Sequence, residues 1–163
     1  MGTRILYLFG FAVCAALIGG ALYFQYVEHL EPCPLCIFQR IFIIVMAVVF
    51  LIAAIHNPRL WGRRVYGLLI ALLSAIGAAI AARHVWLQNL PPDQVPECGP
   101  GLDFMLDAFP MSEVIQMVLS GSGECAEIAW MFLGISIPGW TLLIFGIFFV
   151  AALIFACFRP TSA

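Results

Sequence analysis

Four long runs of apolar residues divide the chain, and shorter, more polar segments separate them. The first run extends from Ile5 to Phe24 without a charged residue, and the second covers about residues 37–55. The third covers about residues 65–82, and the fourth covers about residues 140–158, after a Pro-Gly pair. A helix of about 20 apolar residues crosses a hydrocarbon core about 30 Å thick. The pattern therefore predicts four transmembrane helices.

The composition supports a membrane protein and excludes an ordinary soluble domain. Hydrophobic residues make up 64% of the chain and charged residues only 10%, whereas soluble domains have roughly 45–50% apolar and 25% charged residues. The first apolar run is longer than the roughly 7–15 residues of a signal-peptide core, so we interpret it as a retained helix. We expect an all-α membrane protein in which residues 1–163 form a single four-helix bundle.

The connections between the predicted spans cover about residues 25–36, 56–64 and 85–137. The last of these is rich in proline near its start, which is incompatible with regular helix or central strand. Farther on, Met111 to Leu119 has apolar residues at helical spacing with polar residues on the other side. This pattern predicts a short amphipathic helix that lies in the membrane interface.

The arginines indicate the orientation of the chain, because cytoplasmic loops carry an excess of basic residues. Five of the seven basic residues fall on one side of the predicted membrane: Arg4, Arg59, Arg63, Arg64 and Arg159. We therefore expect both termini and the 56–64 loop to be cytoplasmic. In a bacterium, the 25–36 and 85–137 loops would then be periplasmic. Arg40 and Arg83 are the exceptions, since each lies near the outer end of its span, as an interfacial anchor or a functional residue.

Six cysteines occur, and the topology separates them into two groups. Cys14 and Cys157 fall inside spans, where a thiol is usually a small buried hydrophobe. The other four fall in the outer loops: Cys33, Cys36, Cys98 and Cys125. The outer compartment is oxidising, so disulfides persist there, but four cysteines allow three pairings. Structural disulfides are one interpretation, and we expect no metal site because the chain has only one C-x-x-C motif.

The segment from Cys33 to Arg40 favours redox chemistry over a structural disulfide. Pro34 is suited to the first position of a helix, which would place Cys36 in the first helical turn. There the positive end of the helix dipole favours the thiolate form of a cysteine. Arg40 follows four residues later, on the same helix face, and its guanidinium could stabilise a thiolate or an acidic ligand oxygen. Because the pair lies where the helix enters the bilayer, a lipid-soluble electron acceptor such as a quinone fits the site.

Cys98 follows a different local pattern, because prolines flank it on both sides. We expect it to lie on an exposed, extended loop. A disulfide in such a loop is open to attack by the thiolate of a partner protein.

Three motifs and the order of the spans resemble the DsbB proteins, quinone-dependent oxidases of the bacterial inner membrane. The first motif is Cys33-Pro34-Leu35-Cys36 followed by Gln39-Arg40. The second is Arg83-His84-Val85-Trp86-Leu87-Gln88, and the third is Gly123-Glu124-Cys125-Ala126-Glu127. The resemblance covers essentially the whole chain.

The resemblance implies specific roles for the cysteines. Cys98 and Cys125 would form the pair that exchanges with a periplasmic DsbA-like thiol oxidase. Cys33 and Cys36 would form the pair that reduces a membrane quinone, either ubiquinone or menaquinone. Arg40 would lie at the quinone ring, and His84 matches a family position linked to the quinone. No nucleic-acid partner is expected.

Two alternatives from the sequence differ from this interpretation. A non-enzymatic membrane scaffold with four spans would use the outer disulfides only to hold its loops together. An enzyme similar to vitamin K epoxide reductase would also have four cysteines and a helical bundle, but electrons would flow in the opposite direction.

Overall fold

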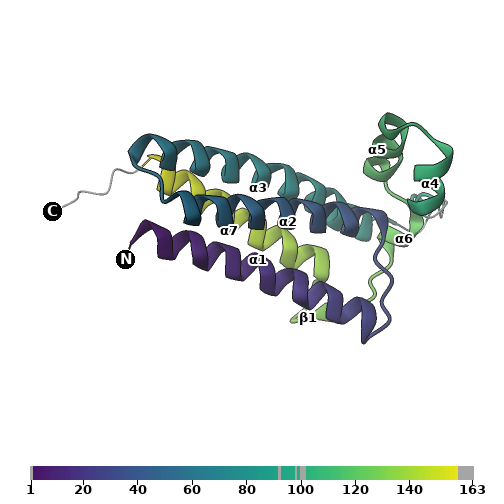
Figure 1. Ribbon diagram of the computed structural model, residues 1–163. Coiled ribbons are helices and arrows are strands. Elements are labelled where there is room, and N and C mark those ends of the chain that lie inside the picture. The colour runs from purple at the N-terminus through teal and green to yellow at the C-terminus, as the bar shows by residue number, and fades with distance from the viewer. Residues whose placement is uncertain (1, 92, 98, 100–101, 158–163) are drawn as a thin grey trace.

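The computed structural model describes residues 2–91, 93–97, 99 and 102–157. Four long helices lie side by side in a bundle (Figure 1). They are α1 (Thr3–Tyr26), α2 (Pro34–His56), α3 (Leu60–Gln88) and α7 (Ile137–Cys157). The predicted all-α, four-helix membrane architecture is confirmed. The observed helices begin two to five residues before the predicted spans, and the first three also extend beyond them.

Local sequence explains where α2 begins and ends. Cys33 is the N-cap residue with an extended backbone, and Pro34 occupies the first helical position, where its missing N–H costs nothing. At the other end, Asn57 adopts a left-handed conformation with φ of 45°, which terminates the helix. Pro58 follows and α3 starts at Leu60, so the turn between the two helices is short.

The helices pack closely because small residues face large aromatic ones. The most extensive contacts join α3 to α7 and α1 to α2. A Cβ atom added to Gly10 would lie 2.6 Å from the Phe50 ring, and one added to Gly77 would lie 2.4 Å from the Phe145 ring. Small residues of this kind allow transmembrane helices to approach closely where van der Waals packing drives association.

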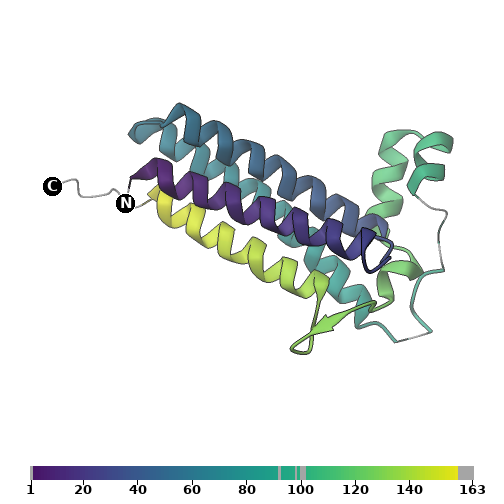
Figure 2. The same cartoon turned by 60° about the horizontal axis from the view of Figure 1, so that its bottom comes forward.

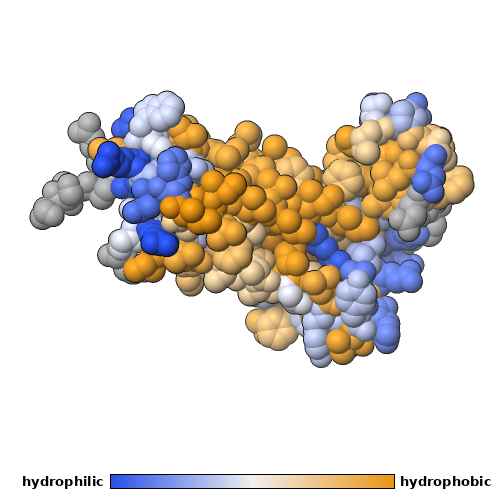
Figure 3. All heavy atoms as spheres, viewed as in Figure 1, coloured by the Kyte–Doolittle hydropathy of each residue, from blue (hydrophilic) through white to orange (hydrophobic). Residues whose placement is uncertain are grey.

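The outer surface of the bundle is apolar along its length. Figure 3 shows hydrophobic residues covering the long helices, with hydrophilic residues gathered toward the ends. Exposed side chains include Phe9 of α1, Ile44 of α2, Leu72 of α3 and Ile147 of α7. All four helices are long and apolar enough to cross a membrane. This surface is suited to contact with lipid rather than water.

The segment between α3 and α7 forms a small layer at one end of the bundle (Figures 1 and 2). It contains α4 (Leu102–Ala108), α5 (Met111–Ser120), α6 (Gly123–Ala126) and an antiparallel hairpin of β1 (Met131–Phe132) and β2 (Ile135–Ser136). The predicted helix at Met111–Leu119 corresponds to α5. The sequence interpretation did not include α4, α6 or the hairpin.

Helix α5 is attached to the bundle through its apolar side. Val114 and Val118 are buried and belong to a hydrophobic cluster that includes Leu35 of α2, Leu87 of α3 and Cys125 of α6. We call this end of the molecule, which holds Cys33, Cys36 and Cys125, the cysteine end. The location of α5 in a membrane interface stays a prediction.

Candidate redox site

Three of the four predicted redox cysteines gather at the cysteine end. Cys33 is the N-cap of α2, Cys36 lies in the first turn of that helix, and Cys125 lies in α6. The sulfur atoms of Cys33 and Cys125 and a ring nitrogen of His84 all lie within 4.8 Å of one another. The fourth cysteine, Cys98, lies outside the described residues. The structure therefore brings together Cys33 and Cys125, which are 92 positions apart in the sequence and lie in two different connections between the long helices.

Cys33 is the shared neighbour in this cluster. Its sulfur lies within 4.8 Å of the Cys125 sulfur, and the His84 ring contacts the sulfurs of both Cys33 and Cys36. Thiol–disulfide exchange proceeds by direct attack of one sulfur on another, so the reacting sulfurs must be neighbours. Cys33 is consequently placed to form a disulfide with either partner.

Cys125 is held in a protonated state in this arrangement. Its side chain is completely buried. The hydrogen bond with Cys33 and, to a lesser extent, burial raise the pKa of the Cys125 thiol well above its ordinary value of 9.0. A neutral thiol is a poor nucleophile, because the thiolate is the reactive form. When the cysteines are reduced, Cys125 is therefore a hydrogen-bond donor to Cys33 and reacts slowly.

His84 of α3 lies between the cysteines and is only 2% exposed. Its Nε2 atom is 3.7 Å from Cys33 Sγ, and its Nδ1 atom is 3.9 Å from Cys36 Sγ. The Nδ1 atom is also 3.2 Å from the amide nitrogen of Gln39, a side chain that is 3% exposed. The sequence interpretation gave Gln39 no role of its own. Its position three residues after Cys36, on the same face of a helix, is the signal that could have identified it.

The cysteine and histidine side chains are residue types that also ligate zinc, but the hydrogen bonding favours another use. An amide nitrogen can only donate, so the His84 Nδ1 atom accepts the Gln39 hydrogen bond. In a neutral imidazole with this bond, the ring proton would be on Nε2, which faces the Cys33 sulfur. A metal ligand would need a lone pair on this nitrogen. The arrangement thus suits hydrogen bonding to sulfur, and the expectation of no metal stays a prediction.

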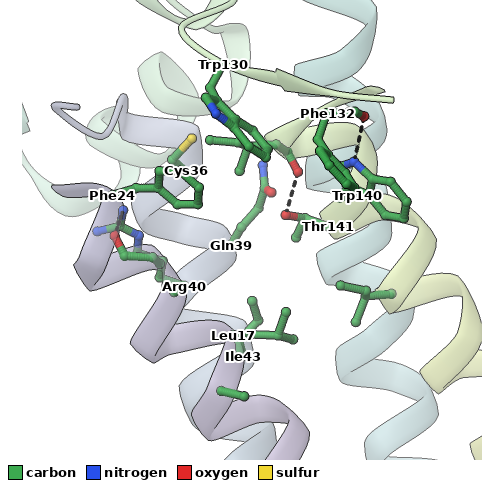
Figure 4. Close-up of a pocket in the computed structure, with 15 residues that line it drawn as sticks. Leu17, Phe24, Cys36, Gln39, Arg40, Ile43, Trp130, Phe132, Trp140 and Thr141 are labelled. Atoms are coloured by element: carbon green, nitrogen blue, oxygen red, sulfur yellow. Dashed lines mark hydrogen bonds between the residues drawn. The ribbon is translucent and has the colours of Figure 1, made fainter. Parts of the chain in front are cut away.

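A cavity of about 380 Å³ opens beside Cys36, between α1, α2, α7 and the hairpin (Figure 4). Cys36, Gln39 and Arg40 lie on the α2 side, and the aromatic rings of Trp130, Phe132 and Trp140 lie across from them. The other lining residues are mainly aliphatic: Ala16, Leu17, Gly20, Ala21, Phe24, Ile43, Ile137, Thr141 and Ile144. This pocket is apolar with a few polar groups at one side, as small-molecule sites usually are.

Arg40 is fixed at the wall of this cavity by two neutral groups of α1. Its guanidinium donates to the side-chain oxygen of Gln25 and, over 3.2 Å, to the carbonyl oxygen of Ala21. Because both acceptors are uncharged, these bonds orient the guanidinium without neutralising its charge. Arg40 is therefore able to stabilise negative charge in the cavity.

Arg83 has a different role from Arg40, although both lie near the outer ends of their predicted spans. Its guanidinium donates to the carbonyl oxygens of Leu119 and Ser120 over 3.3 and 2.9 Å. Its Cζ atom also lies 4.2 Å from the centre of the Trp86 ring. A cation at the last carbonyls of a helix satisfies unpaired acceptors and interacts favourably with the helix dipole. Arg83 thus attaches the C-terminal end of α5 to α3.

The turn after α5 places Cys125. Gly121 ends the helix with φ of 83° and ψ of 155°, a conformation that essentially only glycine adopts. A Cβ atom at this position would lie 2.3 Å from a methyl carbon of Leu87. The chain then enters α6, where the Ser122 hydroxyl is 3.7 Å from Cys125 Sγ. Arg83 and Gly121 together determine where Cys125 lies relative to the other sulfurs.

Comparison with known proteins gives a consistent result. The family model described as "Disulfide bond formation protein DsbB" matches residues 3–155. The chain is 55% identical over 157 residues to "Disulfide bond formation protein B" of Hahella chejuensis, covering 96% of this chain and 94% of the relative. It is 55% identical over 145 residues to the protein of that name from Nitrosococcus oceani, covering 89% and 86%. It is 50% identical over 142 residues to "Disulfide bond formation protein B 1" of Pseudomonas aeruginosa, covering 87% of each.

Proposed function

Because the chain belongs to the DsbB family of disulfide bond formation proteins, we propose that it oxidises a periplasmic DsbA-like dithiol protein and passes the electrons to a membrane quinone. The electrons travel through two cysteine pairs, Cys98–Cys125 and Cys33–Cys36. The enzyme resides in a bacterial inner membrane with both termini in the cytoplasm and the cysteine end in the periplasm. The distribution of arginines supports this orientation.

The position of the Cys33 sulfur carries the proposal. It lies within 4.8 Å of the Cys125 sulfur, and the His84 ring contacts it together with the Cys36 sulfur. Cys36 and Cys125 belong to different predicted pairs. A structural disulfide needs only one neighbour for each sulfur. A sulfur with two sulfur neighbours can exchange one disulfide for another, which is the step needed to connect the two pairs.

The residues of the cavity beside Cys36 fit a quinone. Its volume of about 380 Å³ and its aromatic walls suit a flat, apolar ring. Arg40 provides a hydrogen-bond donor for a ring oxygen, and the cavity lies between α1, α2, α7 and the hairpin. When bound there, the quinone would supply a two-electron acceptor. We propose ubiquinone as the main acceptor, with menaquinone as the alternative.

The cysteines transfer electrons in sequence. A thiolate of the DsbA-like partner attacks Cys98, which breaks the Cys98–Cys125 disulfide and releases Cys125 as a thiolate. Cys125 attacks Cys33 of the Cys33–Cys36 disulfide, so a Cys33–Cys125 bond forms and Cys36 leaves with the electron pair. The second partner thiol displaces Cys98, and Cys98 then attacks Cys125. The Cys98–Cys125 disulfide is restored, and Cys33 and Cys36 are left reduced.

Cys36 and Arg40 deliver these electrons at the cavity wall. Cys36 lines the cavity while Cys33 faces Cys125 and His84. Arg40 follows Cys36 by one helical turn, and its anchored guanidinium stabilises negative charge that develops in the cavity. The driving force for electron transfer is set by the difference in reduction potential between the quinone and the cysteine pairs. For a two-electron couple, each 30 mV of this difference corresponds to about 1.4 kcal/mol.

A direct test mixes the purified protein with ubiquinone and a reduced DsbA-like protein and follows the absorbance of the quinone. We expect quinone reduction by the wild type and none by Cys36→Ser, since serine cannot form or break a disulfide. Cys157→Ser is the matched control, because Cys157 is exposed at the far end of α7 and should leave the rate unchanged. A normal rate in Cys36→Ser would overturn the proposal.

The same assay distinguishes the enzyme from the two alternatives. A scaffold with structural disulfides would give no quinone reduction by any variant, and thiol trapping would show its cysteines unchanged after the partner is added. An enzyme that works in the reverse direction would instead oxidise a quinol and use the two electrons to reduce a disulfide of the partner to two thiols.

A further inference from the structure

Gln39 and His84 form a buried polar pair beside Cys33 and Cys36. Both side chains are at most 3% exposed, and they come from different helices, α2 and α3. The contact between Gln39 Nε2 and His84 Nδ1 is 3.2 Å long. A buried polar group without a hydrogen-bond partner is destabilising, and this contact gives each of the two side chains a partner.

The chemistry of the amide group determines which nitrogen of His84 carries the proton. An amide nitrogen has two hydrogen-bond donors and no acceptor. The Nδ1 atom that faces it must therefore offer a lone pair, and a neutral imidazole with a lone pair on Nδ1 carries its single proton on Nε2. The hydrogen bond made by one ring nitrogen thus determines what the other can do.

The Nε2 atom is directed at the reactive sulfur. It lies 3.7 Å from Cys33 Sγ, which is within hydrogen-bonding distance for sulfur. From these two contacts we propose that Gln39 is a positioning residue that holds His84 in the Nε2–H tautomer, so that the imidazole donates a hydrogen bond to the Cys33 sulfur. The chemical benefit of this bond rests on the proposed function, but the tautomer itself does not.

The benefit arises in the step that restores the Cys98–Cys125 disulfide. Cys98 attacks the Cys125 sulfur, the Cys33–Cys125 bond breaks, and the electron pair of that bond remains on Cys33 Sγ. A donated N–H stabilises the resulting thiolate through a charge-assisted hydrogen bond. The proton stays on Nε2, so the step needs no further proton donor. The opposite tautomer would present a lone pair to the departing thiolate and repel it.

Glutamine is suited to this role in a way that its closest replacements are not. Methionine has a similar length but offers no N–H group, so Gln39→Met would leave the ring free to adopt either tautomer. An ionised glutamate can accept hydrogen bonds but cannot donate them. Gln39→Glu would therefore favour a proton on Nδ1 of His84. The two substitutions therefore test the donor itself, at nearly constant side-chain volume.

The test is nitrogen-15 NMR of the full chain in detergent with labelled histidine, in the reduced protein. The chain has three histidines, and the signals of His84 are identified by their loss in His84→Asn. We expect Nε2 of His84 to give the chemical shift of a protonated nitrogen and Nδ1 that of an unprotonated one. Gln39→Met should give a mixture of tautomers, and Gln39→Glu should give a protonated Nδ1. Gln88→Met is the matched control. Gln88 lies near the end of α3, as His84 does, but its side chain accepts a hydrogen bond from Ser136. The His84 signals of this variant should match those of the wild type.

Two results would overturn the proposal: a protonated Nδ1 with an unprotonated Nε2 in the wild type, or a wild-type pattern in Gln39→Glu. The quinone assay is read separately on the same samples. An inactive wild type with an Nε2–H histidine would reject the proposed function and leave the tautomer assignment standing. An active wild type with the opposite tautomer would do the reverse.

Discussion

Cys33 and Cys36 are placed by the start of a single helix, whereas Cys125 is placed by contacts among three separate segments. The first pair needs only Pro34 at the first position of α2 and the helical geometry that follows. Cys125 needs Arg83 at the end of α5, Gly121 against Leu87, and burial of α6 beside α2. The first half of the site is thus encoded locally, and the second half depends on tertiary packing.

This difference has a consequence for how each half should respond to mutation. Changes near Cys36 should alter the chemistry at the cavity and leave the position of the sulfurs intact. Changes around Cys125 should alter how often its sulfur is next to Cys33, because local segments with few buried contacts open more readily than the core. Substitutions at each half, measured by different assays, test this distinction.

Arg40→Met should have the largest effect, and it should act on the chemistry alone. The substitution removes the positive charge at the cavity wall and keeps the aliphatic part of the side chain. Loss of one donor to a developing negative charge typically costs about 100-fold in rate, and we expect a decrease of that order in quinone reduction. The measurement is single-turnover quinone absorbance after full reduction of the cysteines. Iodoacetamide labelling of Cys125 is the control and should match the wild type, and faster labelling would contradict a purely local role.

Gly121→Ala should have the next largest effect, and it should act on the position of Cys125. Alanine is strained at φ of 83° and ψ of 155°, and its Cβ would collide with Leu87. We expect a cost of about 2 kcal/mol for the closed arrangement, from strain of about 1–3 kcal/mol at such a position. This corresponds to about 30-fold faster labelling of Cys125 in the reduced protein.

Gly134→Ala is the matched control for this prediction. Gly134 also has a positive φ, 77°, but no atom lies within 4 Å of its would-be Cβ, and it belongs to the hairpin. An alanine there would also have a positive φ, but it would not collide with Leu87. Equal acceleration of Cys125 labelling in the two variants would show that general destabilisation, and not the Leu87 contact, controls the position of the cysteine.

The same contrast explains how much could be predicted from the sequence. The four spans follow from uninterrupted apolar runs, and the coincidence of Pro34, Cys36 and Arg40 follows from helical spacing, because both are local properties. The neighbours of Cys33 could not be predicted, since His84 and Cys125 reach it from 51 and 92 positions away. The hairpin was missed because its strands are two residues each, too short for an alternating pattern to be recognised.

The arginines show the limit of sequence rules for single residues. Both Arg40 and Arg83 break the distribution of basic residues in the same way, and the rule alone does not distinguish them. Arg40 faces α1 and a cavity, whereas Arg83 faces the last carbonyls of α5. The partner of each depends on the packing of segments distant in the sequence. Arg83 also stacks on the ring of Trp86, which is about half exposed. It can therefore serve as an interfacial anchor and also hold the end of α5.

Arg83→Met should have a smaller effect than Gly121→Ala on the same observable. It removes two hydrogen bonds to the end of α5 and the favourable charge at a helix C-terminus, together worth about 1 kcal/mol for a partly exposed group. We expect about fivefold faster labelling of Cys125. Arg64→Met, on the opposite end of the molecule, is the control and should leave the labelling rate unchanged. If Arg83→Met instead slowed single-turnover quinone reduction without affecting labelling, Arg83 would belong to the cavity half of the site.

The smallest effect concerns the protonation of Cys125 and its dependence on pH. The hydrogen bond with Cys33 is the main reason that the pKa of Cys125 is raised, so at a given pH below that pKa the thiol is less ionised than an ordinary cysteine. Cys33→Ala removes this bond, lowers the pKa and increases the thiolate fraction. Each unit by which the pKa decreases gives tenfold more thiolate, but that thiolate is less nucleophilic, so the net rate of labelling should rise by about threefold per unit.

The measurement is the iodoacetamide labelling rate of reduced Cys125 from pH 7 to 10, with free cysteine in solution as the reference. The wild-type rate should still be rising at the pH where the reference levels off, and the Cys33→Ala profile should move toward the reference. Superimposable profiles for wild type and variant would mean that burial alone controls Cys125 and that Cys33 is not its hydrogen-bond partner.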